Sequence, residues 1–142
     1  NDKLGDEQPW FIPKAHREAI GREIKARRKT VTLIQARSLR DITKYSGSYK
    51  AVDWLYFFLC TGEVVLADRI SEELFKMFRH LCQAGRLIFL PGFFTKAKLR
   101  EADNLTKRFC HTFYTSVYAG KEERLRECRQ TVVALLDVTA NL

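Results

Sequence analysis

Glycine and proline are scarce in this chain, which has 7 Gly and 3 Pro among its 142 residues. All-β sandwiches and barrels need many tight turns, and those turns depend heavily on these two residue types. The shortage therefore argues against an all-β fold. Internal repeats and low-complexity tracts are absent as well, and a hydrophobic content of 46% is too high for a disordered chain. For this length we expect a single domain that buries about two-thirds of its unfolded surface.

Long apolar runs and N-terminal sorting signals are also missing. The chain has no signal-peptide core, no initiator methionine and no apolar run of about eighteen residues, the length that a membrane-spanning helix needs. We therefore expect an excised domain of a larger soluble protein that has no membrane partner. The predicted organisation is an acidic and aromatic leader over residues 1–12, followed by a single helical domain over residues 13–142.

Cysteine is too sparse for a disulfide scaffold, which would be shorter and denser in cysteine. The four cysteines are widely spaced within apolar helical patterns: Cys60, Cys82, Cys110 and Cys128. We expect buried free thiols in a reducing compartment. The close pairs, His80 with Cys82 and Cys110 with His111, lack zinc-site spacing, and helical residues two apart point about 200° away from each other. The sequence therefore predicts no metal ligand.

Catalytic constellations are lacking too. The acidic candidates are scattered along the chain: Asp41, Asp53, Asp68, Glu72, Glu73, Glu101 and Asp103. Asp53 is the sole acid of an apolar helix, so it either lies at an exposed position or has a partner such as Lys50 or an arginine of the basic segment. The glycines are isolated, which excludes a phosphate-binding loop. We predict no catalytic residue, no cofactor and no enzymatic activity.

A strong helical pattern is present in Ser48–Phe89, and it predicts two packed helices joined by a short turn. The first, over about residues 49–60, is apolar on nearly every side, and such a helix is normally buried. The second starts near Asp68, with Asp68 or Ser71 as its N-cap. The apolar residues of this second helix keep the spacing of one buried stripe: Ile70, Leu74, Met77, Phe78 and Leu81. We expect a break at Gly85.

On the N-terminal side of this pair, the sequence predicts a thinly apolar, strongly basic helix from Pro13 to about Lys29, since proline suits the first helical position. The β-branched residues 30–34 are compatible with a short strand, but we favour a second helix that continues through residue 39.

On the C-terminal side of the expected break at Gly85, a short apolar run over residues 87–90 stops at Pro91 and Gly92. A helix over about residues 96–118 follows, with Thr95 as its cap and Gly120 at its end. Its expected buried face is Leu99, Ala102, Leu105, Phe109, Phe113 and Val117. A last helix covers about residues 122–138. The predicted fold is all-α, a compact bundle of five to six helices with a basic N-terminal helix.

The net charge of +8 is concentrated in one segment. Residues 14–50 hold eleven Lys and Arg against three Asp and Glu, whereas residues 1–12 are net acidic and residues 51–142 are nearly neutral. This pattern predicts an acidic partner: nucleic acid, bound through its phosphates in a salt-dependent way, or an acidic protein. A solvated charged face is the alternative. The candidate phosphate contacts are Lys14, Arg17, Arg22, Lys25, Arg27, Arg28, Lys29, Arg37, Arg40 and Lys44.

The segment Leu39–Phe89 resembles a region of CACTA (En/Spm)-type transposases. The similarity lies in a small-residue loop ahead of Lys50–Trp54 (KAVDW), and in a following helix with Glu72, Phe78 and Leu81 in matching positions. In that family this region lies outside the catalytic acidic core. The resemblance therefore implies no active site in this region. It implies a role in DNA engagement, self-association or partner docking within a nuclear transposase or a domesticated descendant.

Two functional hypotheses follow. The first is a non-catalytic helical domain of a transposase-like nuclear protein that engages nucleic acid, DNA above all, through residues 14–44. The alternative is a protein–protein interaction module of a chromatin or RNA-silencing complex, which docks through an apolar groove. Its candidate anchors are aromatic, as interface hot spots often are: Trp10, Phe11, Phe93 and Phe94. Packing at the ends of the core is the other explanation for these side chains, and a homo-oligomer is a possible assembly.

Overall fold

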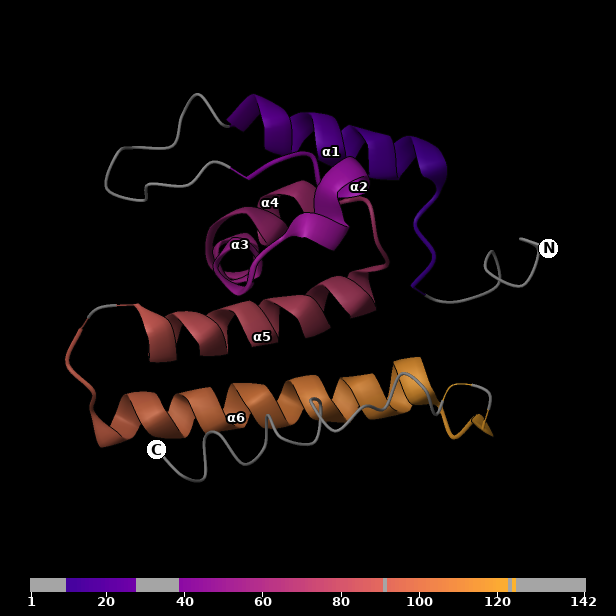
Figure 1. Ribbon diagram of the computed structural model, residues 1–142. Coiled ribbons are helices and arrows are strands. Elements are labelled where there is room, and N and C mark those ends of the chain that lie inside the picture. The colour runs from indigo at the N-terminus through magenta and orange to yellow at the C-terminus, as the bar shows by residue number, and fades with distance from the viewer. Residues whose placement is uncertain (1–9, 28–38, 91, 123, 125–142) are drawn as a thin grey trace. The chain divides into compact units, whose positions relative to one another are not determined.

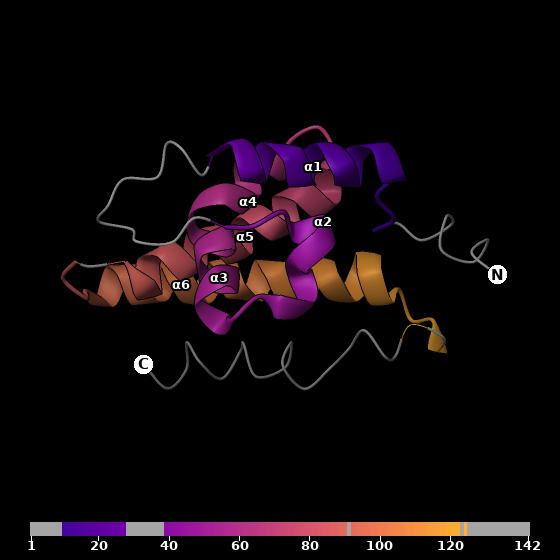
Figure 2. The ribbon, with the colours of Figure 1, turned by 45° about the horizontal axis from the view of Figure 1, so that its top comes forward.

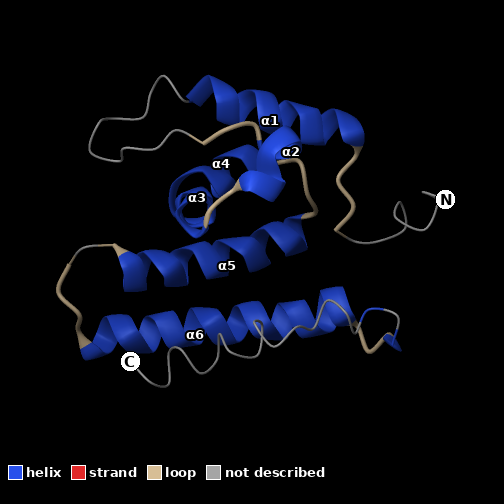
Figure 3. Ribbon diagram, viewed as in Figure 1, coloured by secondary structure: helices blue, strands red, loops and turns tan. Residues whose placement is uncertain are grey.

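The computed structural model describes residues 10–27, 39–90, 92–122 and 124 (Figure 1). Within these residues every regular element is helical and no strand is present (Figure 3), which confirms the all-α prediction. The chain divides into two compact units, Asn1–Ile70 (unit 1) and Ser71–Leu142 (unit 2).

Unit 1 contains four α-helices in its described part, and Figure 2 shows them from a second direction. Their bounds are α1 Lys14–Arg27, α2 Ile42–Tyr45, α3 Ala51–Tyr56 and α4 Gly62–Leu66. The Pro13 carbonyl accepts the first α-helical hydrogen bond, from Arg17 N at 3.0 Å, so α1 begins where the sequence predicts. α1 buries Ile20, Gly21 and Ile24, and it packs against α2 and α4.

The helix predicted over residues 49–60 is longer than expected and less buried. α3 continues through a π-helical segment, Phe57–Thr61, directly into α4, so the helical path ends at Leu66 rather than near Cys60. Phe57 and Val65 are buried, but other large apolar side chains of this path are exposed: Val52, Trp54, Leu55 and Val64. The prediction of a helix buried on all sides is therefore wrong. Apolar residues around a helix allow any side of it to be buried, but the elements packed against the helix decide which side is buried.

Asp53 acts as a helix cap. Its carboxylate is buried and accepts a hydrogen bond from the Lys50 backbone N–H at 2.8 Å, as part of a capping box at the start of α3. The sequence points to Lys50 or an arginine as a partner, and the contact from Lys50 is made by its peptide N–H rather than by its ammonium. A buried carboxylate needs such a donor, and this one also satisfies a free N–H at the helix start.

α1 and α2 approach each other closely at Gly21. Asp41 caps α2, because its Oδ1 accepts hydrogen bonds from Thr43 N at 3.0 Å and from Thr43 Oγ1 at 2.6 Å. A Cβ added at Gly21 would lie 2.1 Å from Asp41 Oδ1 and 2.9 Å from Thr43 Oγ1. Only glycine leaves room for the cap at this position of α1.

Unit 2 is built on two long helices, α5 Glu72–Phe89 and α6 Lys96–Thr112, which lie side by side in Figures 1 and 2. Ser71 Oγ accepts from Leu74 N at 3.4 Å and Thr95 Oγ1 accepts from Lys98 N at 3.2 Å, so two caps named from the sequence are confirmed. The predicted break at Gly85 is wrong, since α5 continues to Phe89. Glycine lowers helix stability by about 1 kcal/mol relative to alanine. The packing of α5 against α6 outweighs this cost.

The buried residues of unit 2 only partly match the predicted stripes. The buried ones on α5 and α6 are Leu74, Cys82, Ala84, Ala102, Thr106 and Phe109. Val117 is buried in the π-helical segment Phe113–Tyr118 that prolongs α6. Leu99 and Leu105 are only half-buried, whereas Thr106 is buried and donates to the Ala102 carbonyl at 2.9 Å. A threonine that satisfies its own hydroxyl within the helix can take a core position.

Several predictions fall outside the described residues. These are the second helix or strand over residues 30–38, nearly all of the last helix, and Cys128. Of the other cysteines, Cys82 is buried and Cys110 is half-buried, but Cys60 is exposed, contrary to expectation. No helix in the described part of the chain is long and apolar enough to cross a membrane.

Replacing Gly21 with alanine tests the close approach of α1 and α2. Gly21→Ala should lower the free energy of unfolding by about 1–3 kcal/mol, because the new methyl group overlaps the α2 cap. Urea denaturation followed by circular dichroism would measure this. Gly47→Ala is the control, since nothing lies within 4 Å of a Cβ built there. A Gly21→Ala variant that is as stable as its Gly47→Ala counterpart would contradict the packing.

Candidate functional site

Six of the ten candidate phosphate contacts lie in the described part of unit 1 with exposed side chains: Lys14, Arg17, Arg22, Lys25, Arg40 and Lys44. These six residues are called the basic surface below. Arg27 is half-buried, and the remaining three candidates, Arg28, Lys29 and Arg37, lie outside the described residues. Among the described residues, Lys14 pairs with Glu18 at 3.9 Å, and no acidic side chain forms an ion pair with Arg17, Arg22, Lys25 or Lys44.

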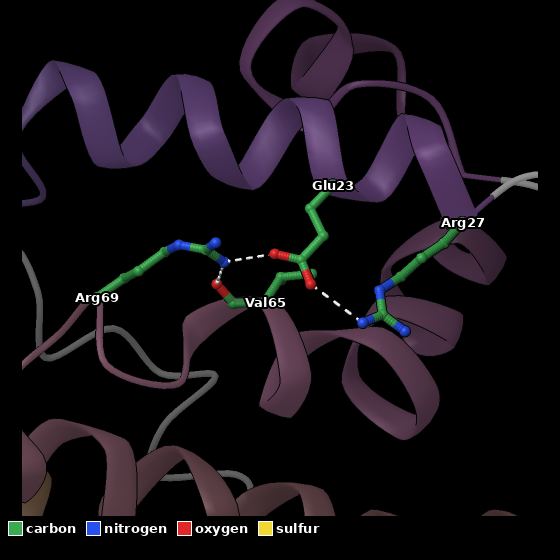
Figure 4. A network of polar contacts seen from close by, with 4 residues as sticks. All are labelled: Glu23, Arg27, Val65 and Arg69. Atoms are coloured by element: carbon green, nitrogen blue, oxygen red, sulfur yellow. Dashed lines mark hydrogen bonds and ion pairs between the residues drawn. The ribbon is translucent and has the colours of Figure 1, made fainter.

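Arg27 belongs to an ion-pair network that fastens α1 to the end of α4 (Figure 4). Arg27 Nη2 lies 3.0 Å from Glu23 Oε1, and Arg69 Nη1 lies 2.7 Å from Glu23 Oε2. Arg69 Nη1 also donates to the Val65 carbonyl at 2.6 Å. The hydrogen bonds from Arg69 and then Arg27 hold the pKa of Glu23 below its ordinary value. This network gives Arg27 a structural role that the sequence does not reveal.

Arg40 is held in place by the turn after α2. Its Nη2 donates to Ser48 Oγ at 2.9 Å, and its guanidinium carbon lies 5.1 Å from the centre of the Tyr45 ring. The Arg40 carbonyl accepts from the Tyr49 hydroxyl, whose pKa is raised to about 12 by burial and, secondarily, by the charges of Asp53 and Asp41. Arg40 is thus an exposed cation with a fixed orientation.

A pocket of about 710 Å³ opens in unit 1 beside three members of the basic surface, Lys14, Arg17 and Lys44. Glu18 is the acidic residue on its wall. The interior is largely apolar, and its apolar residues are Ile12, Ile20, Ile42, Trp54, Phe57 and Leu66. These residues come from four separate segments of the chain. No spacing in the sequence indicates that they meet, so the pocket could not be predicted from the sequence.

The aromatic anchor candidates differ in exposure. Trp10 is half-buried and Phe11 is marginally exposed, whereas Phe93 is 91% exposed and Phe94 61% exposed. The two phenylalanines lie in the turn between α5 and α6, next to the exposed Phe89 and Leu90. Three exposed cations follow in the first turns of α6: Lys96, Lys98 and Arg100. The turn therefore presents apolar rings beside positive charge.

Several of the acidic residues that the sequence offers as catalytic candidates form structural contacts instead. Asp41 and Asp53 cap helices, while Glu72 pairs with Lys76 and Asp103 pairs with Lys107. In the parts of the chain that the structure describes, no three His, Cys, Asp or Glu side chains group as metal ligands would.

No family model, curated protein or solved structure matches this chain. The resemblance to CACTA-type transposases therefore stays a prediction from the sequence.

The Glu23 network should make stability depend on pH. Because the pKa of Glu23 is lowered on folding, its contribution is complete above the ordinary value of 4.5 and is lost as pH falls through the folded-state pKa. We expect Glu23→Gln to lower the free energy of unfolding at pH 7 by on the order of 1 kcal/mol. The difference in the free energy of unfolding between Glu23→Gln and the wild type should shrink below pH 4.5.

Chemical denaturation at a series of pH values measures both effects. Glu18→Gln is the matched control, because the Glu18 pair with Lys14 is long and exposed, and should change stability by less than about 0.5 kcal/mol. If both variants behave alike at every pH, Glu23 does not hold α1 in place.

Proposed function

We propose that unit 1 binds nucleic acid, with DNA as the expected form, through the basic surface. The observation that carries this proposal is the exposure of six cations, five of which have no acidic ion-pair partner among the described residues. Solvated charged faces normally carry both signs, so an unbalanced set favours a polyanionic partner.

The arrangement on α1 suits a phosphate backbone. Arg22 and Lys25 are three residues apart and therefore share one side of the helix, and Lys14, eleven residues before Lys25, lies on nearly the same side. The first turn of α1 has no acidic side chain, so its free N–H groups and its cations attract anions together. Contacts of this kind read phosphates rather than bases, and binding is expected to be largely independent of sequence.

The resemblance to CACTA-type transposases supports the same proposal from a different direction. It implies a nuclear protein and a non-catalytic region with a role in DNA engagement, self-association or partner docking, and the first of these three roles agrees with the basic surface. The acids that sequence analysis considered as candidates for catalysis include Asp41 and Asp53, which serve as helix caps. We therefore propose a non-catalytic role for this region.

A salt series tests the proposal. Fluorescence anisotropy of a labelled DNA duplex should give a steep fall of affinity with salt, because each phosphate contact releases counterions. Arg22→Gln combined with Lys25→Gln should weaken binding and lower the slope of log K against log salt by roughly 2. This pair of residues lies outside the pocket and outside the core.

The control is Lys76→Gln combined with Lys107→Gln, which removes the same charge from exposed, ion-paired positions of unit 2. We expect this control to leave the slope nearly unchanged. Equal losses in both double variants would show a net-charge effect without a defined surface, and no binding near physiological salt would refute the proposal.

A second candidate function rests on the turn between α5 and α6. A phenylalanine that is 91% exposed, with a second one beside it and cations following, favours an acidic protein segment that carries apolar side chains. This is the protein-interaction hypothesis, with Phe93 and Phe94 as its anchors.

Comparing acidic peptides that contain aromatic residues with acidic peptides that lack them distinguishes docking on the phenylalanines from attraction by charge alone. A labelled peptide of the first kind should bind, and Phe93→Ser combined with Phe94→Ser should weaken that binding by roughly tenfold or more. Tyr114→Ser is the control, because Tyr114 is another exposed aromatic residue of unit 2. Peptide binding that is insensitive to the phenylalanines, or driven by acidity alone, would remove the aromatic turn as the docking point.

A further inference from the structure

We infer that the pocket of unit 1 receives an unpaired base of DNA, so that unit 1 favours DNA with a single-stranded end over a fully paired duplex. The inference rests on the proposed function, since the same cations would hold the phosphates. It goes further by adding a preference that phosphate contacts alone do not produce.

The size and lining of the pocket are those of a small-molecule site, with room for a planar base. About 710 Å³ lies within the range of small-molecule sites, which are mostly apolar with a few polar groups. Here the polar groups are Thr43 and Ser46. Thr43 Oγ1 donates its proton to Asp41 and keeps the capacity to accept, and the Ser46 hydroxyl has no partner among the described residues. Base edges need donors and acceptors of this kind.

Charge decides which kind of apolar ligand is favoured. The pocket is lined by Lys14, Arg17 and Lys44, against Glu18 alone. An uncharged ring or an apolar peptide side chain would gain nothing from these cations. A nucleotide satisfies both parts of the site, because its base is apolar on both faces while its phosphates are anionic.

Trp54 supplies an aromatic surface for the base. Trp54 is 37% exposed as a residue and lines the pocket. Tyr49 and Phe57, which also lines the pocket, contact the Trp54 ring, with ring centres at 5.1 Å and 6.3 Å from its own. Stacking of a base on such a ring does not depend on which base is present, and its loss typically weakens binding by roughly 5- to 150-fold.

The test compares three DNAs: a blunt duplex, the same duplex with a short single-stranded overhang, and the overhang duplex with abasic overhang nucleotides. The abasic form keeps every phosphate and removes only the bases. A 2-aminopurine in the overhang reports stacking through quenching of its fluorescence. The full chain is used, as wild type and as Trp54→Leu, Trp54→Phe and Ser46→Phe.

We expect the normal overhang to bind at least several-fold more tightly than the abasic overhang, with quenching of 2-aminopurine. Trp54→Leu should abolish the preference and Trp54→Phe should largely keep it. Ser46→Phe fills the pocket from an exposed position, so it removes the preference without disturbing the core, even if Trp54→Leu fails to fold.

The two proposals fail in different ways. Equal, salt-dependent binding of all three DNAs by the wild type would overturn the inference and leave the proposed function standing. A preference for bases that survives both Trp54→Leu and Ser46→Phe would also overturn it. No binding of any DNA near physiological salt would refute both.

Discussion

The attachment of α1 to the rest of unit 1 is the constraint on which the other properties of this unit depend. α1 carries four of the six residues of the basic surface, yet its buried side is narrow, consisting of Ile20, Gly21 and Ile24. A highly charged helix with so little apolar surface is marginal on its own. Two local arrangements fix it: the absence of a side chain at Gly21, which admits the α2 cap, and the Glu23 carboxylate, which binds Arg69.

Charges of one type have two distinct uses in this unit. Arg27 and Arg69 converge on Glu23 and hold the helices together, whereas Arg22 and Lys25 have no acidic ion-pair partner among the described residues. Exposed like charges on one helix repel each other, and this repulsion lowers the stability of the free protein. A polyanion removes that repulsion when it binds, so the same residues that weaken the free form favour the complex.

Aromatic residues also divide between two environments. Phe57 and Phe109 are buried in units 1 and 2, respectively, and belong to their cores. Trp54 and Phe93 are exposed, the first beside cations that line a pocket and the second beside cations at the start of α6. Each unit therefore presents an apolar ring next to positive charge, which is the combination that anionic partners with apolar parts require.

The sequence by itself determined the helical class and several helix ends. The apolar spacing along α5 and the caps at Ser71 and Thr95 depend on residues within one or two turns, so they could be read without knowing the fold. The concentration of cations between residues 14 and 50 is likewise visible in the sequence, although the function that it predicts is still to be tested.

Tertiary structure alone decided which side chains are buried, where α5 ends and where the pocket lies, because these features depend on contacts between residues distant in the chain. The passage of α5 through Gly85, the exposure of Trp54 and the role of Gly21 all follow from which element lies against which. The pocket joins residues from Ile12 to Leu66, and Glu23 meets Arg69 across 46 positions. Local patterns carry no information about such pairings, since each side chain is compatible with many neighbours until the helices pack.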